Sequence, residues 1–205
     1  MIIGISGLIG SGKDTVAQYL VDQHGYTRHS WASSVKDAVA NIFGWDRALL
    51  EGDTAESRVW RERVDRWWSH RLEIPNFSPR YALQYVATDL FREKLHQDIW
   101  IASVEYKLVS SRGDVVISDC RFQNELDTIR RLGGVCIRVV RGSDPPWVEL
   151  ARNDFNKFRE AYPQIHPSEY SSVGLYYDYV LDNNGTLEQL YSNINDLLLN
   201  PPGAR

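Results

Sequence analysis

Short apolar runs alternate with amphipathic segments along most of the chain. The runs are rich in β-branched and aromatic residues and are bounded by polar turns, which predicts strands at residues 2–6, 26–31, 114–118, 135–140 and 179–181. Between the runs, apolar residues recur at helical spacing and predict helices at residues 14–22, 33–43, 81–95, 99–110, 124–132 and 187–199. Strands that alternate with helices predict an α/β fold whose parallel sheet is covered on both faces.

One stretch departs from this alternation. Residues 51–80 are charged and rich in tryptophan, with a helical pattern in the first half and turns around Pro75 and Pro79. We interpret this stretch as an insertion in the α/β fold. We expect its tryptophans to pack into a small core of the insertion's own.

The composition excludes several classes of protein. Hydrophobic residues make up 43% of the 205 residues and aromatic residues 12%, which is too much for a disordered chain. The formal net charge of −4 offers no general attraction to duplex nucleic acid or anionic membranes, so we expect neither as a partner. Cys120 and Cys136 lack metal-site spacing, and no apolar stretch approaches the roughly 18 residues of a membrane span. We expect a soluble, cytoplasmic protein with reduced thiols.

A glycine-rich loop lies between the first predicted strand and helix. Residues 7–15 read Gly-Leu-Ile-Gly-Ser-Gly-Lys-Asp-Thr and match the phosphate-loop pattern G-x-x-x-x-G-K. Such glycines let the backbone N–H groups turn inward, and the following helix adds the positive end of its dipole. We predict that the phosphates of ATP are bound by Gly10, Ser11, Gly12, Lys13, Asp14 and Thr15.

Two acidic residues are candidates for a magnesium site. Asp14 stands where serine or threonine is usual; it either contacts Mg²⁺ or serves as a favourable charge in the first helical turn. Asp119 follows the predicted strand at residues 114–118, the arrangement by which such folds hold Mg²⁺ or its water near the transferred phosphate. A helix N-cap is the other interpretation of Asp119, and it does not exclude the first.

The remaining sequence bears on the phosphate acceptor. The Asn-Lys-x-Asp tetrad by which GTPases read guanine does not occur in the sequence. Arginines outnumber lysines, and the planar guanidinium suits the recognition of phosphate. These features favour a small-molecule kinase, whose chemistry consists mainly of charge neutralisation and positioning.

Several groups of residues carry a resemblance to a known family. They are Gly10 to Thr15, Ala32 to Lys36, Ser78-Pro79-Arg80 with Gln84 and Thr88-Asp89, and the block Asp119 to Glu125. Together they resemble the phage deoxynucleoside monophosphate kinases of the P-loop kinase superfamily. Later segments agree with that family at Gly133-Gly134, Arg141, His166 with Ser168-Glu169, and Asp182 to Gly185. The chain departs from the pattern at Ala87, where glycine is usual, and at Ser33-Ser34, where Asp-Pro is usual.

The resemblance implies a three-layer α/β/α kinase fold in a single domain, residues 1–205. Within it, residues 51–100 would form a helical substrate-binding insertion and residues 141–172 a lid-like segment. The implied reaction transfers the γ-phosphoryl group of ATP to a deoxynucleoside monophosphate, with Mg²⁺ as cofactor. The implied compartment is the cytoplasm, that of the host if the chain is phage-encoded.

The resemblance also implies roles for individual residues. The expected catalytic residues are Lys13, Asp119, Arg121 and Arg141. The expected acceptor-site residues are Lys36, Arg80, Gln84, Arg92, Trp100 and Asn124, with Arg58 and Arg61 as further phosphate contacts. Asn183, Asn184 and Gly185 are expected either to approach the adenine of ATP or to form a plain turn before the final helix.

Other interpretations stay open at this point. Trp100 can be an ordinary core aromatic, and Arg92 can belong to a solvated helix face. A kinase similar to dephospho-CoA kinase would phosphorylate a sugar hydroxyl and use Asp119 as the proton acceptor. A nucleotide-dependent binding module is the alternative outside the kinases. Exposed tryptophans on the insertion would suit a homodimer contact.

Overall fold

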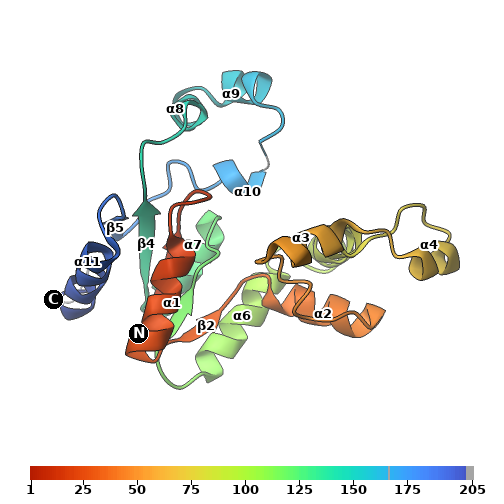
Figure 1. Cartoon of the computed structure of the whole chain (residues 1–205), viewed down its shortest axis with the longest axis horizontal. Coiled ribbons are helices and arrows are strands. Elements are labelled where there is room, and N and C mark those ends of the chain that lie inside the picture. The colour runs from red at the N-terminus through yellow and green to blue at the C-terminus, as the bar shows by residue number, and fades with distance from the viewer. Residues whose placement is uncertain (166, 202–205) are drawn as a thin grey trace. The chain divides into compact units, whose positions relative to one another are not determined.

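The computed structural model describes residues 1–165 and 167–201, which divide into two compact units (Figure 1). The first, called here the core unit, consists of Met1–Trp31 and Lys107–Arg205. The second, the inserted unit, is Ala32–Tyr106. The range 51–100 of the expected insertion lies inside the inserted unit, which also includes the helix that precedes it.

The core unit is built on a parallel sheet. Among the described residues its strands are β1 (Ile2–Ser6), β2 (Thr27–His29), β3 (Val115–Ile117), β4 (Val135–Val140) and β5 (Tyr179–Asp182). They are ordered β2-β3-β1-β4-β5, and every neighbouring pair is parallel. The predicted strands are therefore confirmed, although β2 ends before Ser30 because Ser30 and Trp31 turn to bond with Asp119.

Helices cover both faces of this sheet. On one face, α1 (Lys13–His24) and α11 (Leu187–Leu199) pack over Ile3 and Ile5 in a shared hydrophobic core. On the other face lies α7 (Gln123–Arg131), where Ile129 comes so close to Gly4 that a Cβ there would meet Ile129 Cδ1 at 2.2 Å. Successive residues of a strand point to opposite faces, so this alternation confirms the predicted three-layer α/β/α arrangement.

The inserted unit is helical. Its helices are α2 (Ser33–Phe43), α3 (Ala55–Glu62), α4 (Arg66–Leu72), α5 (Pro79–Gln84), the π-helix η1 (Tyr85–Arg92) and the first part of α6 (Ile99–Ser110). Side-chain caps start three of them: Thr54 accepts the N–H of Ser57, Asp65 that of Trp68 and Ser78 that of Tyr81.

Aromatic side chains form the centre of the inserted unit. Phe43 stacks on Trp45 with ring centroids 4.7 Å apart and meets the edge of Trp68 at 5.0 Å. The indole N–H of Trp68 donates to the carbonyl of Phe43, and that of Trp45 donates to Asp65. Trp60 and Trp68 pack against the buried core of this unit, as expected for the insertion, but Trp67 does not join that core and is exposed.

The predicted helix at residues 81–95 has a different course. It begins at Pro79, capped by Ser78, and changes at Tyr85 into the π-helix η1. The indole of Trp100 donates to the carbonyl of Ala87 within η1, at 2.9 Å. A side-chain donor at the helix ladder is one of the known causes of such irregularity, and periodicity in the sequence does not report it.

Residues 141–172, the expected lid-like segment, contain helices that the apolar pattern did not predict. They are α8 (Pro146–Asn153), α9 (Phe155–Ala161) and α10 (Pro167–Tyr170). Phe158 is fully buried at their centre, with ring contacts of 5.2–6.1 Å to Trp147, Phe155, Tyr162 and Tyr170. The helices are short and are held by contacts with one another, so they have no long periodic signal.

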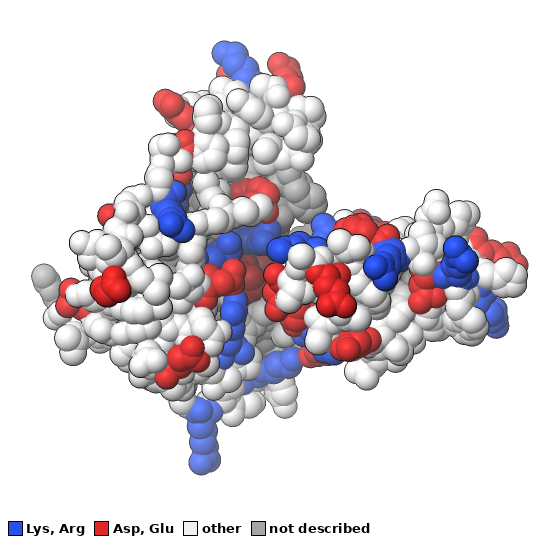
Figure 2. Space-filling model, viewed as in Figure 1, with Lys and Arg blue, Asp and Glu red and all other residues white. Residues whose placement is uncertain are grey.

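Acidic and basic side chains are interspersed on the face of the molecule shown in Figure 2. None of the helices in the described part of the chain is both long enough and apolar enough to cross a membrane.

Candidate active site

The phosphate loop joins β1 to α1 and is held by a residue that follows β5, the strand at one edge of the sheet. Gly10 and Gly12 have φ angles of 82° and 94°, in the left-handed region that favours glycine. Asn183, buried just after β5, donates its side-chain N–H to the carbonyl of Ser11 at 2.8 Å. A Cβ on Gly12 would come within 2.2 Å of Asn183 Nδ2, so glycine is also required there by space.

Lys13 begins α1 and lies among several of the charged residues that the sequence singled out. Partial burial lowers the pKa of its ammonium group, and the positive charge of Arg121 acts in the same direction. The carboxylates of Asp14, Glu169 and Asp119 oppose this change in the pKa. The charges of Asp14, Asp119 and Arg121 therefore all act on Lys13.

Asp14 is engaged with the neighbouring strands. Its carboxylate pairs with the guanidinium of Arg28 from β2. Arg28 also donates from Nε and Nη2 to the hydroxyl of Ser118, at 3.2 and 2.7 Å. Ser118 is buried directly after β3, so Arg28 connects the first turn of α1 with the end of that strand.

Asp119 holds the end of β2. Its Oδ2 accepts the hydroxyl of Ser30 at 2.6 Å, and its Oδ1 accepts the backbone N–H of Trp31 at 3.1 Å. The residue after it, Cys120, is buried against the indole N–H of Trp31. Asp119 is thus anchored at the point where the chain leaves the core unit.

Arg121 lies between α7 and the expected lid segment. The buried carboxylate of Glu125 accepts the backbone N–H groups of Arg121 and Phe122 at 2.7 and 3.0 Å and caps α7. The guanidinium of Arg121 pairs with Glu169 of α10 at 3.1 Å. His166, noted in the sequence beside Glu169, lies outside the described residues.

The loops after β4 and β5 are joined to each other. Asn184 accepts the backbone N–H of Gly142 at 2.6 Å and also bonds with Asp182. Arg141 and Gly185 lie on these loops and are exposed. The expected roles of Arg141, Asn184 and Gly185 toward ATP stay predictions.

In the inserted unit, Lys36 belongs to a compact group of ion pairs. It pairs with Glu51, which also pairs with Arg47, and Arg47 Nε donates to Asp37 Oδ1 at 2.6 Å. Burial works against ionisation of Glu51, but the hydrogen bonds from Lys36 and Arg47 outweigh it and lower the pKa of that carboxyl group.

The same unit gathers arginines around Arg61. Burial and then the positive charge of Arg80 lower the pKa of Arg61; Glu62 and Glu51 oppose this, and Arg58 adds to it. Arg61 Nε is buried and has no hydrogen-bond partner among the described residues. The side chain packs over Gly52, where a Cβ would lie 2.0 Å from Arg61 Cζ. We call Arg58, Arg61 and Arg80 the arginine cluster.

The other expected acceptor residues differ in their surroundings. Gln84 is exposed at the end of α5, and Asn124 is exposed on α7 of the core unit. Arg92 has a buried Nε without a hydrogen-bond partner in the described part of the chain. Trp100 is 7% exposed, packs on Phe91 at 5.0 Å, and has the surroundings of a core aromatic. Its expected stacking on a base stays a prediction.

Arg28 and Ser118 were not among the residues that the sequence analysis selected. The parallel register pairs Arg28 with Val116 in β3, two residues before Ser118. A register between two strands separated by almost ninety residues has no signal in one sequence. The signal that could have indicated such a residue is the acidic side chain at position 14, because a carboxylate next to the expected phosphate site requires a nearby cation.

A glycine loop after β1, a lysine at the start of α1 and a carboxylate after β3 define a nucleotide-binding protein of the phosphate-loop class. The chain is 34% identical over 209 residues to a protein of Acanthamoeba polyphaga mimivirus named as a deoxynucleotide monophosphate kinase, covering 95% of this chain and 94% of the relative. This chain therefore belongs to the deoxynucleotide monophosphate kinase family.

Two further relatives have the same kind of name. The deoxynucleoside-5′-monophosphate kinase of Escherichia phage T5 is 28% identical and covers 63% of this chain and 72% of its own length. The deoxynucleotide monophosphate kinase of Enterobacteria phage T4 is 22% identical over 96% of this chain and 98% of its own length. No family profile matches the chain.

Solved structures resemble the chain more distantly. TT1252 from Thermus thermophilus has a TM-score of 0.46 and 21% identity, and covers 99% of this chain and 98% of its own. The dephospho-CoA kinase of Campylobacter jejuni has a TM-score of 0.46 and 12% identity, with coverages of 97% and 95%. The family assignment rests on the sequence relatives.

Proposed function

We propose that this protein transfers the γ-phosphoryl group of ATP to the phosphate of a deoxynucleoside monophosphate, giving ADP and a deoxynucleoside diphosphate. The observation that supports the proposal is that the chain holds two different groups of residues suited to phosphate, the glycine loop with Lys13 in the core unit and the arginine cluster in the inserted unit. A kinase whose acceptor is itself a phosphate needs one site of each kind. The names of the relatives in mimivirus and the two phages agree with this reaction.

The donor site would bind ATP through backbone and lysine contacts. The inward N–H groups of the loop and the start of α1 would hold the β- and γ-phosphates, and Lys13 would add a positive charge that follows the transferred group. Arg121 and Arg141 would neutralise charge that develops during transfer. For this, the guanidinium of Arg121 would either break its ion pair with Glu169 or bind the phosphoryl group and Glu169 at the same time. Asn184 and Gly185 would approach the adenine.

The residues near Lys13 fit a magnesium ion held mainly by ATP and water. Mg²⁺ usually keeps several waters and takes only one or two protein carboxylates beside substrate phosphates. Asp119 would fit this pattern as a carboxylate that directly follows a strand and accepts a hydrogen bond from a metal-bound water. When bound, the ion would neutralise charge between the β- and γ-phosphates.

The acceptor phosphate would bind at the arginine cluster. A guanidinium with a depressed pKa and an unpartnered buried Nε gains from a dianion, which removes the repulsion from Arg80 and supplies an acceptor. The attacking oxygen already carries negative charge, so no proton acceptor is required. Asp119 would then position water rather than remove a proton.

The nucleoside part of the acceptor would meet the remaining candidates. Gln84 and Asn124 carry both a donor and an acceptor and can read a base edge, and Arg92 can use its unpartnered Nε. Lys36 would contact the acceptor phosphate while Glu51 stays within reach of Arg47. Trp100 would contribute only the small part of its ring that is exposed.

A coupled assay of ATP turnover tests the proposal. The four deoxynucleoside monophosphates, dephospho-CoA and buffer without acceptor are compared at the same concentration of MgATP. We expect stimulation by at least one deoxynucleoside monophosphate and not by dephospho-CoA. Stimulation by none of the four would refute the proposal; turnover with dephospho-CoA alone would identify a hydroxyl kinase, and slow turnover independent of acceptor would identify a nucleotide-dependent binding module.

Two further expectations accompany the proposal. Cys120 and Cys136 are free and buried, which is compatible with action in the reducing cytoplasm. Trp67 is 63% exposed on α4, a position where a second copy of the chain could bind. Sedimentation of the purified protein over a range of concentrations tests the homodimer.

A further inference from the structure

The position after the phosphate-loop lysine carries an unusual charge. Asp14 lies in the first turn of α1, where a serine or threonine is usual, and 70% of its side chain is exposed. Because Asp14 directly follows Lys13 and the glycine loop, its carboxylate would lie near the phosphates of a bound ATP. The repulsion would weaken nucleotide binding unless a cation neutralises it, and two cations are available.

The first cation is Arg28, which is held in place from two sides. Its Nη2 pairs with Asp14 Oδ1, and its Nε and Nη2 both donate to the hydroxyl of Ser118, at 3.2 and 2.7 Å. Ser118 Oγ itself lies 3.5 Å from Asp14 Oδ1. Because Ser118 is buried at the end of β3, the guanidinium has a fixed anchor as well as an ionic partner.

The second cation is Lys13. Asp14 raises the pKa of Lys13 against the lowering effect of burial, so the two charges already interact. Without Arg28, the carboxylate of Asp14 would draw on Lys13 more strongly. That would harm ATP binding twice, by leaving a negative charge next to the phosphates and by competing with them for the lysine.

We propose that Arg28 is a positioning residue of the ATP site, which neutralises Asp14 and leaves Lys13 available to the phosphates of the nucleotide. The proposal rests on ATP binding at the phosphate loop, as argued above. It assigns Asp14 the role of an anchor for Arg28, in place of the magnesium contact that the sequence left open. The need for Arg28 is therefore conditional: it exists only while position 14 is negatively charged.

A double-mutant cycle tests this dependence. Arg28→Gln removes the charge and keeps an amide donor for Ser118, and Asp14→Asn removes the opposing charge. Equilibrium binding of a non-hydrolysable ATP analogue is measured for the wild type, both single variants and the double variant, with and without Mg²⁺. We expect about 10-fold weaker binding for Arg28→Gln, near-normal binding for Asp14→Asn, and recovery to within about 3-fold in the double variant.

Two more variants separate charge from structure. Arg28→Lys keeps the positive charge and loses the fork, so it should bind within about 3-fold of the wild type. Arg112→Ala removes an exposed arginine elsewhere in the core unit and should not change binding. Thermal unfolding of each variant shows whether it is folded, and Arg28→Lys carries the test if Arg28→Gln is not.

Three results would overturn the proposal. Equal loss in Arg28→Gln and in the double variant would mean that Arg28 acts directly or only supports the fold. If the single variant Asp14→Asn binds the ATP analogue equally well with and without Mg²⁺, whereas the wild type binds it more tightly with Mg²⁺, Asp14 is a metal contact. Unchanged binding in Arg28→Gln would remove any role. Because binding of the analogue needs no acceptor, the cycle stands even if no deoxynucleoside monophosphate is phosphorylated.

Discussion

The two candidate phosphate sites of the molecule differ in the charges that surround their cations. In the core unit, the cations near the phosphate loop have carboxylate neighbours: Arg28 has Asp14, Arg121 has Glu169, and Lys13 feels Asp14 and Asp119. In the inserted unit, burial and then the positive charge of Arg80 lower the pKa of Arg61, and Arg58 adds a smaller effect in the same direction, against Glu62 and Glu51. The cations near the phosphate loop therefore have carboxylate partners, whereas the guanidinium of Arg61 is buried next to another positive charge.

This difference teaches how each site would gain affinity. Glycine conformations and Asn183 fix the backbone of the phosphate loop, so in the proposed site backbone N–H groups would bind the phosphates and little excess positive charge would be needed. At the arginine cluster, an anion would instead relieve the repulsion between Arg61 and Arg80 and supply an acceptor to the buried Nε of Arg61. Substitutions should therefore affect the two substrates separately.

The largest expected effect is at Lys13. Lys13→Ala removes the cation that accompanies the transferred phosphoryl group, and we expect phosphoryl transfer to fall at least about 100-fold. The coupled assay measures this, with Lys157→Ala on an exposed part of α9 as the matched control. Transfer at more than a tenth of the wild-type rate would contradict the role of the loop as the donor site.

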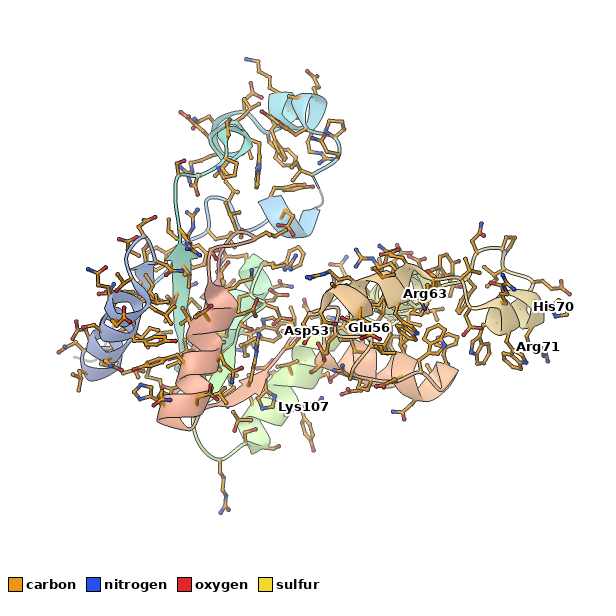
Figure 3. All side chains as sticks on the ribbon, in the orientation of Figure 1. Asp53, Glu56, Arg63, His70, Arg71 and Lys107 are labelled. Carbon is orange, nitrogen blue, oxygen red and sulfur yellow. The ribbon has the colours of Figure 1, made fainter. Side chains whose placement is uncertain are left out.

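The next effect separates the two units. Arg80→Ala should raise KM for the deoxynucleoside monophosphate about 10- to 100-fold, since charge-assisted hydrogen bonds contribute about 1.5–3 kcal/mol. KM for ATP should change little. Arg71→Ala, an exposed arginine in the last turn of α4 (Figure 3), is the control in the same unit. Equal changes in both KM values would show that the sites are not separable in this way.

A smaller effect is expected at the support of the phosphate loop. Asn183→Ala leaves the buried carbonyl of Ser11 without its donor, which should cost about 1–3 kcal/mol of the free energy of unfolding. KM for ATP should rise, while KM for the acceptor stays nearly constant. Calorimetry and initial rates measure the two effects, with Asn156→Ala on the exposed side of α9 as control. An unchanged melting temperature of Asn183→Ala would show that the hydrogen bond from Asn183 does not stabilise the phosphate loop.

The smallest effect concerns pH and the ion pairs of the inserted unit. The folded-state pKa of Glu51 lies below its ordinary value of 4.5, so its pairs stabilise the protein above that pH and are lost as the pH falls through the lower, folded-state pKa. The wild type should lose more stability on acidification than Glu51→Gln. Denaturant unfolding at a series of acidic pH values measures this, and parallel curves would contradict it.

Local features of the chain were predictable to different degrees. The strands and the longer helices were predicted from periodicity. Each is a continuous segment, such as the five residues of β1 or the thirteen of α11, and the spacing of its apolar residues can be recognised within that segment. The helices α8 to α10 did not, since the ring contacts around Phe158 join residues from Trp147 to Tyr170. The π-helix η1 involves contacts such as the hydrogen bond from the indole of Trp100 to the carbonyl of Ala87. The helical pattern of the residues next to Ala87 does not report such a contact.

The sequence by itself determined the phosphate loop, because every part of that site is consecutive and its glycines are required by backbone conformation. It also located Asp119, which directly follows an apolar strand. Only the tertiary structure decided what these residues touch. The parallel register brings Arg28 to Ser118, β5 delivers Asn183 to the loop, and helix packing in the inserted unit places Arg61 near Arg80. Charge and hydrogen bonding act through space, and distance along a chain does not report distance in space.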